Sequence, residues 1–101
     1  MAGYLTGKVA LVIGEGDDTH RGVVVAMAEA GADVAIAGVT SDLSAEAALH
    51  SISNEIWALN RRSAVVTMAA DDEASLAGAL DNAQQELGSA DLVVRCEAVP
   101  G

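Results

Sequence analysis

Short apolar runs alternate along the chain with longer stretches that repeat hydrophobic residues at helical spacing. The apolar runs are rich in branched residues and predict buried strands at residues 8–13, 33–37, 63–68 and 91–96. The stretches between them predict helices at residues 21–30, about 44–60 and about 72–87. The expected order of elements is therefore β-α-β-α-β-α-β.

Residues at the ends of the predicted helices agree with this division. Gly31 and Gly88 follow the first and third helices, where a left-handed residue commonly ends a helix. Arg61 and Arg62 follow the second helix and favour its negative end. Candidate N-terminal caps are Ser41 or Ser44 for the second helix and Asp71 or Asp72 for the third. The expected inward stripes are Leu49, Ile52, Ile56 and Leu59, with Trp57 beside them, and then Leu76, Leu80, Ala83 and Leu87.

Strands joined by crossover helices form a parallel sheet, and such connections are right-handed in nearly all cases. The expected strand order is 3-2-1-4, as in the first half of a doubly wound dinucleotide fold. The fold class is thus a truncated Rossmann-like three-layer α/β/α arrangement, with a four-stranded parallel sheet and three helices. We expect residues 1–101 to form a single partial domain of this kind.

Composition narrows the choice of partners. Five basic and fifteen acidic residues give a formal net charge of −10. Phosphate contact needs clustered Lys and Arg, so nucleic acid and anionic membranes are excluded as expected partners. No apolar run approaches the length of a membrane span. The lone Cys96 cannot form an internal disulfide, which favours a cytoplasmic location.

Three segments, "LTGKVALVIG", "AEAGADVAIAG" and "DDEASLAGALDNAQQELGSADLVV", together resemble the short-chain dehydrogenase/reductase family. The resemblance covers almost all of the chain, but only about the first 40% of a typical family member of ~250 residues. It implies an NAD or NADP cofactor and a catalytic Tyr-x-x-x-Lys pair in a later segment that this sequence does not reach. Lys8 follows Tyr4 at the matching spacing, but on a predicted strand, so Tyr4 is interpreted as a packing or edge residue. We expect no catalytic residues and no enzyme.

The family's cofactor loop reads T-G-x-x-x-G-x-G, and here its first glycine is Gly14. The later two glycine positions hold Asp18 and His20. In the family the middle glycine lets the backbone approach the pyrophosphate, and the last lets helix and strand pack closely. A carboxylate ~4 Å from a diphosphate would repel it by about 4 kcal/mol at a surface-like dielectric. We expect Asp17 or Asp18 to replace the phosphate as the cap of the first helix.

Other cofactor signals are also absent. The second strand ends in Gly38-Val39-Thr40, without the acidic residue that the family uses to bind the ribose. Ala69 stands where an adenine-binding Asp is common in the family. The family's N-N-A-G motif after the fourth strand is replaced by Arg95-Cys96-Glu97-Ala98. The degenerate loop, with Gly14, Gly16, Asp18 and His20, is therefore expected to bind no cofactor, or NAD or NADP only weakly. No metal site is expected, because Glu15, Asp17, Asp18 and His20 match no established spacing. His20 and His50 are interpreted as surface or helix residues, and Cys96 as unreactive.

The fourth strand, from Asp91 to Cys96, would leave one edge unpaired, and native proteins seldom leave such an edge uncovered. We therefore expect a protein partner at this edge, either a second copy or a full-length short-chain dehydrogenase/reductase. The leading hypothesis is a non-catalytic subunit derived from that family, acting as a structural or assembly partner. The alternatives are the cofactor-binding half of a split NAD(P)-dependent oxidoreductase and a minimal module for an uncharged nucleoside.

Overall fold

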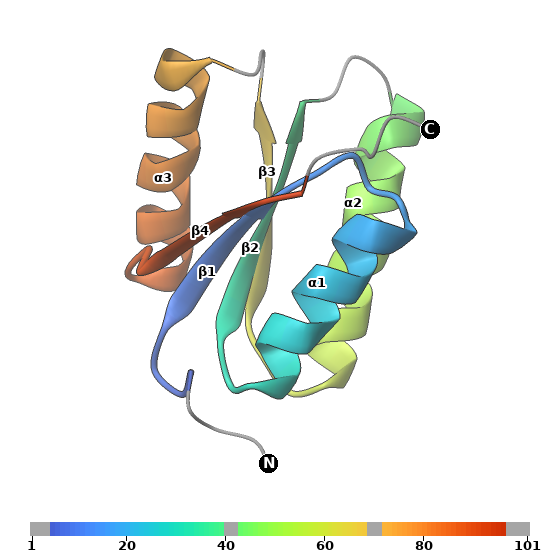
Figure 1. Ribbon diagram of the computed structural model, residues 1–101, viewed down its shortest axis with the longest axis vertical. Coiled ribbons are helices and arrows are strands. Elements are labelled where there is room, and N and C mark those ends of the chain that lie inside the picture. Colours follow the sequence, from blue (N-terminus) through green and yellow to red (C-terminus); the bar gives the residue numbers. More distant parts are fainter. Residues whose placement is uncertain (1–4, 40–42, 69–71, 97–101) are drawn as a thin grey trace.

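The computed structural model describes residues 5–39, 43–68 and 72–96 as three layers, with a sheet between helices (Figure 1). The elements are β1 (Val9–Ile13), α1 (Asp18–Glu29), β2 (Asp33–Val39), α2 (Leu43–Ala58), β3 (Ser63–Met68), α3 (Glu73–Leu87) and β4 (Leu92–Arg95). All strands are parallel, in the order β3-β2-β1-β4. The predicted fold class and strand order are confirmed.

Two apolar clusters hold the layers together. On one face α3 packs against alternate residues of the strands, and on the other face α1 and α2 pack against the residues between them (Figure 1). All five residues of β1 are buried, as a central parallel strand requires. Alanines occupy several inward positions of strands and helices, which lets the helix backbones come close to the sheet. The cluster under α3 comprises Val9, Leu11, Ile13, Ala35, Ala37, Val66, Met68, Ala79, Ala83 and Leu87.

Helix boundaries differ from the predicted ones where capping decides them. Helix α1 begins at Asp18, three residues earlier than predicted, because the side chain of Asp17 caps it. Asp72 is confirmed as the cap of α3, its Oδ1 accepting from the Ser75 N–H at 2.8 Å, and Gly88 ends that helix at φ 91°. Ser44 is the second residue of α2, which begins at Leu43. The alternative caps Ser41 and Asp71 lie outside the described residues.

The predicted inward stripes are correct in part. Leu49, Ile52 and Ile56 are buried, but Leu59 is 42% exposed because α2 ends one residue before it, and Trp57 is 56% exposed. On α3, the innermost positions are Ala79, Ala83 and Leu87, with the predicted Leu76 and Leu80 only partly buried. The helix is thus rotated slightly toward its alanines, which permit the closest approach.

Arg61 lies at the end of α2, where its backbone N–H donates to the carbonyl of Ile56, and the guanidinium groups of Arg61 and Arg62 also bond to other helices. The Nε of Arg61 donates to the carbonyl of Ala28 in the last turn of α1, at 3.3 Å. The Nη2 of Arg62 donates to the carbonyl of Leu87 at the end of α3, at 3.0 Å, and this side chain also pairs with Asp33. Terminal helix carbonyls lack partners within their own helix, so cationic donors are favourable there.

The described residues contain no helix long and apolar enough to cross a membrane.

Candidate functional site: the loop after β1

The loop of residues 14–17 leaves the carboxyl end of β1 and leads into α1. At this edge of a doubly wound sheet the first strand turns toward a helix N-terminus, the usual place for a phosphate. The Gly14 N–H donates to the carbonyl of Ala37 at 3.0 Å, so the start of the loop is fixed against β2. Gly16 adopts φ +78°, a conformation that other residues rarely adopt.

The imidazole of His20 fills the interior of this loop. His20 lies in the first turn of α1 and is fully buried. Its Nδ1 accepts from the backbone N–H of Gly16 at 3.0 Å, and its Nε2 lies 3.1 Å from the carbonyl oxygen of Val12. The interpretation of His20 as a surface residue is wrong, because these two backbone groups turn the ring inward; its position on a helix is confirmed.

These two partners fix the protonation of His20. A carbonyl only accepts, so Nε2 must carry the hydrogen, and an N–H only donates, so Nδ1 must carry none. Burial lowers the pKa of His20 below 6.5, outweighing the hydrogen bond to Val12 and the nearby charge of Asp17, both of which raise it. The ring is therefore neutral at pH 7 and acts as an internal hydrogen-bonding group.

The ring lies directly against the α-carbon of Gly14. A β-carbon placed on Gly14 would come within 2.5 Å of Cγ and 2.8 Å of Cδ2 of His20. Real β-carbons do not approach other atoms this closely, so Gly14 must remain a glycine for the ring to fit. The space beside the first glycine, which a cofactor-binding loop leaves open, is filled by a side chain of the same protein.

The amide groups at the start of α1 are also used internally. The Oδ1 of Asp17 accepts from the His20 N–H at 3.0 Å, and Asp17 is the N-cap of the helix. The prediction that an acidic side chain caps this helix is confirmed for Asp17. Asp18 is the first residue of the helix, and both it and Glu15 are exposed. Carboxylates therefore border the loop where an anion would enter.

The neighbouring strand end approaches the loop closely. A β-carbon on Gly38 would lie 2.9 Å from the carbonyl oxygen of Gly14 and 3.1 Å from a methyl group of Leu49. Beside the loop, the Nη2 of Arg21 lies 2.6 Å from Oε1 of Glu55, which joins α1 to α2. This ion pair holds the pKa of Glu55 below its usual value. Among the described residues at this edge, the guanidinium of Arg21 is thus committed to a carboxylate.

The remaining candidates form no reactive or metal-binding cluster among the described residues. Burial, and then the charge of Asp17, raise the pKa of the Cys96 thiol, which disfavours a thiolate. No group of three or more His, Cys, Asp and Glu side chains in the described part of the chain is arranged to hold a metal. His50 lies on exposed α2 surface, 3.7 Å from Glu46. Tyr4, Thr40, Ala69, Glu97 and Ala98 lie outside the described residues.

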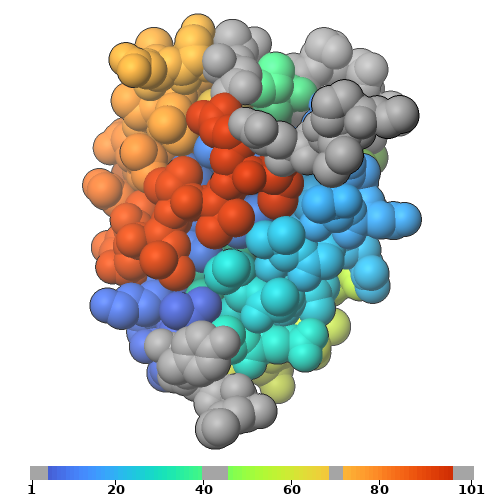
Figure 2. Space-filling view, in the orientation of Figure 1, coloured from blue at the N-terminus to red at the C-terminus, as the bar shows by residue number. Residues whose placement is uncertain are grey.

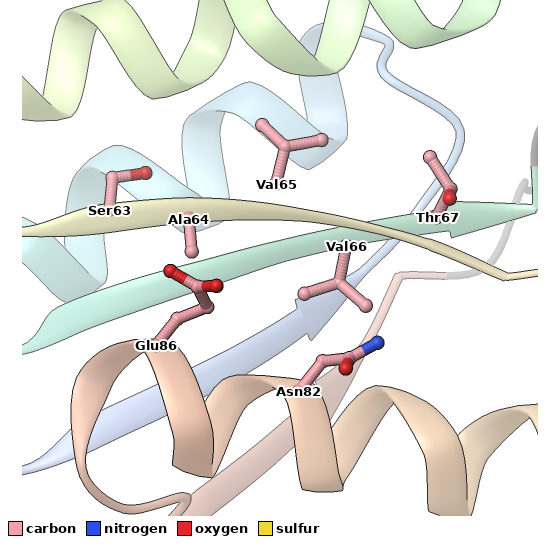
Figure 3. A pocket seen from close by; sticks show the side chains of 7 residues that line it. All are labelled: Ser63, Ala64, Val65, Val66, Thr67, Asn82 and Glu86. Atoms are coloured by element: carbon pink, nitrogen blue, oxygen red, sulfur yellow. The ribbon is translucent and has the colours of Figure 1, made fainter.

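A second hollow lies far from this loop, along the outer edge of β3. It is an open groove of about 440 Å³ between β3 and α3. Figure 3 shows Ala64 and Val66 pointing toward α3, from which Asn82 and Glu86 approach the strand. Among the described residues that line it, Glu86 alone is ionisable, so these residues offer no paired acid and base and no cationic site. This groove was not predicted from the sequence, because it depends on where α3 lies relative to the strand edge.

The fold has counterparts among solved structures. A short-chain type dehydrogenase/reductase from Mycobacterium marinum is 30% identical, with a TM-score of 0.75, over 88% of this chain and 34% of that one. The chain resembles the N-terminal part of the short-chain dehydrogenases/reductases. A blue fluorescent protein from a metagenomic library, in complex with NADPH, is 29% identical over 88% of this chain and 35% of its own, with a TM-score of 0.77. Carveol dehydrogenase from Mycobacterium avium, in complex with NAD, is 25% identical over 97% and 38%, with a TM-score of 0.79.

The chain thus spans little more than a third of the length of these three proteins. No protein-family model matches it, and no curated protein matches it. The sequence located the loop correctly and identified Asp18 and His20 as its unusual residues. It did not reveal that His20 is an internal hydrogen-bonding plug. The sequence did contain one indication of this arrangement, because His20 stands where the family has a glycine that allows helix and strand to pack closely. A ring at that position must either point out of the loop or fill it.

Proposed function

We propose that this chain is a non-catalytic subunit derived from a short-chain dehydrogenase/reductase, which has lost dinucleotide binding and acts as a structural or assembly partner. The observation that carries the proposal is the position of the His20 ring in the loop, hydrogen-bonded to Gly16 and lying beside the carbonyl of Val12. A diphosphate at this place would need the same room and the same amide groups.

Two features support the loss of cofactor binding independently of the ring. Asp17 already accepts the His20 N–H that would face a phosphate. Glu15 and Asp18 are exposed at the loop and add negative charge, which repels an anion even when water screens it. A protein of this kind without its dinucleotide has no hydride donor, so we propose that the chain acts by binding another protein. The lone thiol of Cys96 fits a place in the cytoplasm.

The test is calorimetric titration of the full chain with NADH and with NADPH. We expect no binding by the wild-type chain. The variant Asp18→Gly/His20→Gly restores the family glycines, and it should bind at least roughly ten-fold more tightly, because it removes both the ring and one repelling carboxylate. Asp18→Gly alone is the matched control: it lowers the charge but keeps the ring, and it should stay close to the wild type.

Circular dichroism establishes that each variant is folded before titration. If the double variant does not fold, His20→Asn with Asp18→Gly shortens the side chain while keeping a polar group toward the loop. Tight binding of either dinucleotide by the wild-type chain would overturn the proposed loss of binding.

A second candidate is the cofactor-binding half of a split NAD(P)-dependent oxidoreductase. It is supported by the likeness to structures solved with NADPH and with NAD over this same part of their fold. It requires a second polypeptide that carries a Tyr-x-x-x-Lys pair, and it predicts dinucleotide-dependent reductase activity when the two are mixed. The titration of the wild-type chain separates the two candidates, because only the split oxidoreductase predicts that the wild-type chain binds NADH or NADPH.

A further inference from the structure

The outer edge of β3 lies open along the groove beside α3. It is the edge of the sheet opposite to β4, which Figure 2 shows in red on the surface between α3 and α1. Native proteins commonly protect a strand edge with a charged residue, a proline or a bulge. The six residues Ser63–Met68 include no charged residue and no proline, and their pairing with β2 runs without a bulge. Nothing in β3 itself therefore opposes pairing with a further strand.

The hydrogen bonds between β2 and β3 show which backbone groups of β3 face outward. The Val34 N–H donates to the carbonyl of Arg62, and Val34 stands opposite Ser63 in the register. In a parallel pair a residue bonds to the two neighbours of the residue opposite it, so Arg62 and every second residue after it face β2. The N–H and C=O groups of Ser63, Val65 and Thr67 therefore point away from β2 by alternation. No described residue forms a backbone hydrogen bond with these outward groups.

Helix α3 forms one wall of the groove along this edge. Figure 3 shows Ala64 and Val66 directed toward α3, and Asn82 and Glu86 extending from that helix toward β3. The groove volume of about 440 Å³ lies within the range of ordinary ligand-binding pockets. A strand added beside β3 would occupy this groove and would place every second side chain beside Asn82 and Glu86.

The charge on this wall indicates the chemistry of the added strand. Glu86 is exposed and forms no ion pair with another described residue. The guanidinium of Arg62 reaches the carbonyl of the next residue, Leu87, but it is already bonded to that carbonyl and to Asp33. The whole chain has a formal net charge of −10, which attracts cationic segments over a longer range. A lysine or arginine is thus the complementary side chain opposite Glu86.

Helix α2 lies on the other side of the same edge and offers an apolar surface. The hydroxyl oxygens of Ser53 on α2 and Ser63 on β3 lie 2.9 Å apart, so this side of α2 faces β3. Residues four apart lie on the same side of a helix, which places Trp57 one turn beyond Ser53. Trp57 is 56% exposed, and Val65 packs on the same face of the sheet. The alternate side chains of an added strand would lie on this face, where apolar residues fit best.

We propose that the β3 edge binds an extended segment of another protein as an additional strand, with a lysine or arginine facing Glu86 and apolar residues on the α2 side. Backbone hydrogen bonds to Ser63, Val65 and Thr67 provide affinity, and Glu86 selects a basic sequence. The inference rests on the proposed function, since it gives the structural subunit a surface for its partner. A second copy of the chain fits this surface less well, because it brings the same net charge of −10.

The first experiment is calorimetric titration of the full chain with a synthetic peptide, acetyl-Thr-Val-Lys-Val-Thr-Val-Thr-amide. In an extended strand its lysine and threonines share one face and its valines the other. We expect saturable binding with a dissociation constant below about 1 mM. The fluorescence of Trp57, the only tryptophan, should change on binding. A control peptide with Glu in place of Lys should bind roughly five-fold more weakly, as expected for exposed charges.

Methylated peptides test for strand addition itself. Only every second N–H of an added strand faces β3, so methylation of one alternate set of peptide amides blocks the hydrogen bonds, and methylation of the other set leaves them intact. We expect one of these two peptides to lose affinity at least roughly ten-fold and the other to bind like the parent. Equal affinity of the two methylated peptides would overturn the proposal.

Variants of the chain test the charge and the edge separately. Glu86→Lys should weaken binding of the lysine peptide roughly five-fold and strengthen binding of the glutamate peptide. Asp81→Lys is the matched control, since it changes the net charge equally at an exposed position of α3 outside the groove, and it should leave the preference for lysine unchanged. Thr67→Pro removes an outward N–H but no hydrogen bond to β2, so it should abolish binding, whereas Thr67→Ala should retain it. Circular dichroism establishes that each variant is folded.

The outcomes separate this inference from the proposed function. Absence of saturable peptide binding by the folded wild-type chain, or an unchanged peptide preference in Glu86→Lys, would overturn the docking edge. Self-association of the wild-type chain that Thr67→Pro abolishes would identify a second copy as the occupant and overturn the choice of another protein. A chain that binds both the peptide and NADH retains the docking edge and rejects the loss of cofactor binding. A chain that binds neither rejects the docking edge alone.

Discussion

Replacing His20 by Phe tests whether the ring is an internal hydrogen-bonding group. Phe keeps a ring of similar shape and removes both nitrogen atoms. The Val12 carbonyl, which is in a fully buried residue, and the Gly16 N–H, which is in a partly buried one, then lose their side-chain partner. The Val12 carbonyl keeps its place in the ladder with β2 and loses only a second hydrogen bond, worth about 0.5–1.5 kcal/mol, whereas the unsatisfied Gly16 N–H costs about 1 kcal/mol because water can reach it. We expect a loss of about 1.5–2.5 kcal/mol in the free energy of unfolding.

The assay is thermal and urea unfolding followed by circular dichroism. For a domain of this size 1 kcal/mol shifts the melting temperature by about 4–8 °C, so His20→Phe should melt roughly 6–20 °C lower than the wild type. His20→Gln keeps a donor for Val12 and should lose about half as much free energy. His50→Gln, at an exposed position, should change stability by less than about 0.5 kcal/mol. A His20→Phe protein as stable as the wild type would refute the assignment of the ring to the loop.

Three further predictions concern stability. Burial lowers the pKa of His20 below 6.5, so the buried neutral ring contributes fully to the free energy of unfolding above pH 6.5. This contribution is lost as the pH falls toward the pKa of His20 in the folded state, by at most about 1.4 kcal/mol per pH unit. Urea titrations between about pH 5 and 7.5 should show this dependence of the free energy of unfolding on pH in the wild type and in His50→Gln, but not in His20→Gln. The same dependence in His20→Gln would contradict its assignment to the His20 ring. Gly78→Ala should raise the free energy of unfolding by about 0.5–1 kcal/mol, since a β-carbon there meets nothing within 4 Å. Gly38→Ala should lower it by about 1–3 kcal/mol, because a β-carbon there would lie 2.9 Å from the carbonyl oxygen of Gly14. Equal effects of the two substitutions in denaturant melts would count against the packing described. Asp72→Ala should cost about 1 kcal/mol through loss of the α3 cap, and Asp72→Asn, which can still cap, should retain most of it.

The fold was predictable because its local signals agree with each other. Apolar runs such as 63–68 coincide with a strand to the residue, and Asp72 and Gly88 mark the ends of α3 where capping requires them. The boundaries that differ, such as the start of α1, depend on which of several acidic residues caps the helix. Hydrophobic periodicity contains no information about that choice.

The candidate site was predictable as a location but not as an arrangement. The replaced glycines identified the loop and its excess of negative charge. The position of the His20 ring depends on two backbone groups, from Val12 and Gly16, and the pattern of side chains along the sequence does not show which backbone groups a buried ring will meet. The bonds from Arg61 and Arg62 to other helices escaped prediction for the same reason, because they depend on how the layers are placed in space.

The adjacent arginines after α2 have a consequence for how the molecule comes apart. Arg61 holds the end of α1 on one face of the sheet, and Arg62 holds the end of α3 on the other. A single short turn thereby ties together two helices that the sheet keeps from touching. Neither helical layer can loosen at this end without straining the connection that supports its counterpart, so the two are coupled into one cooperative unit.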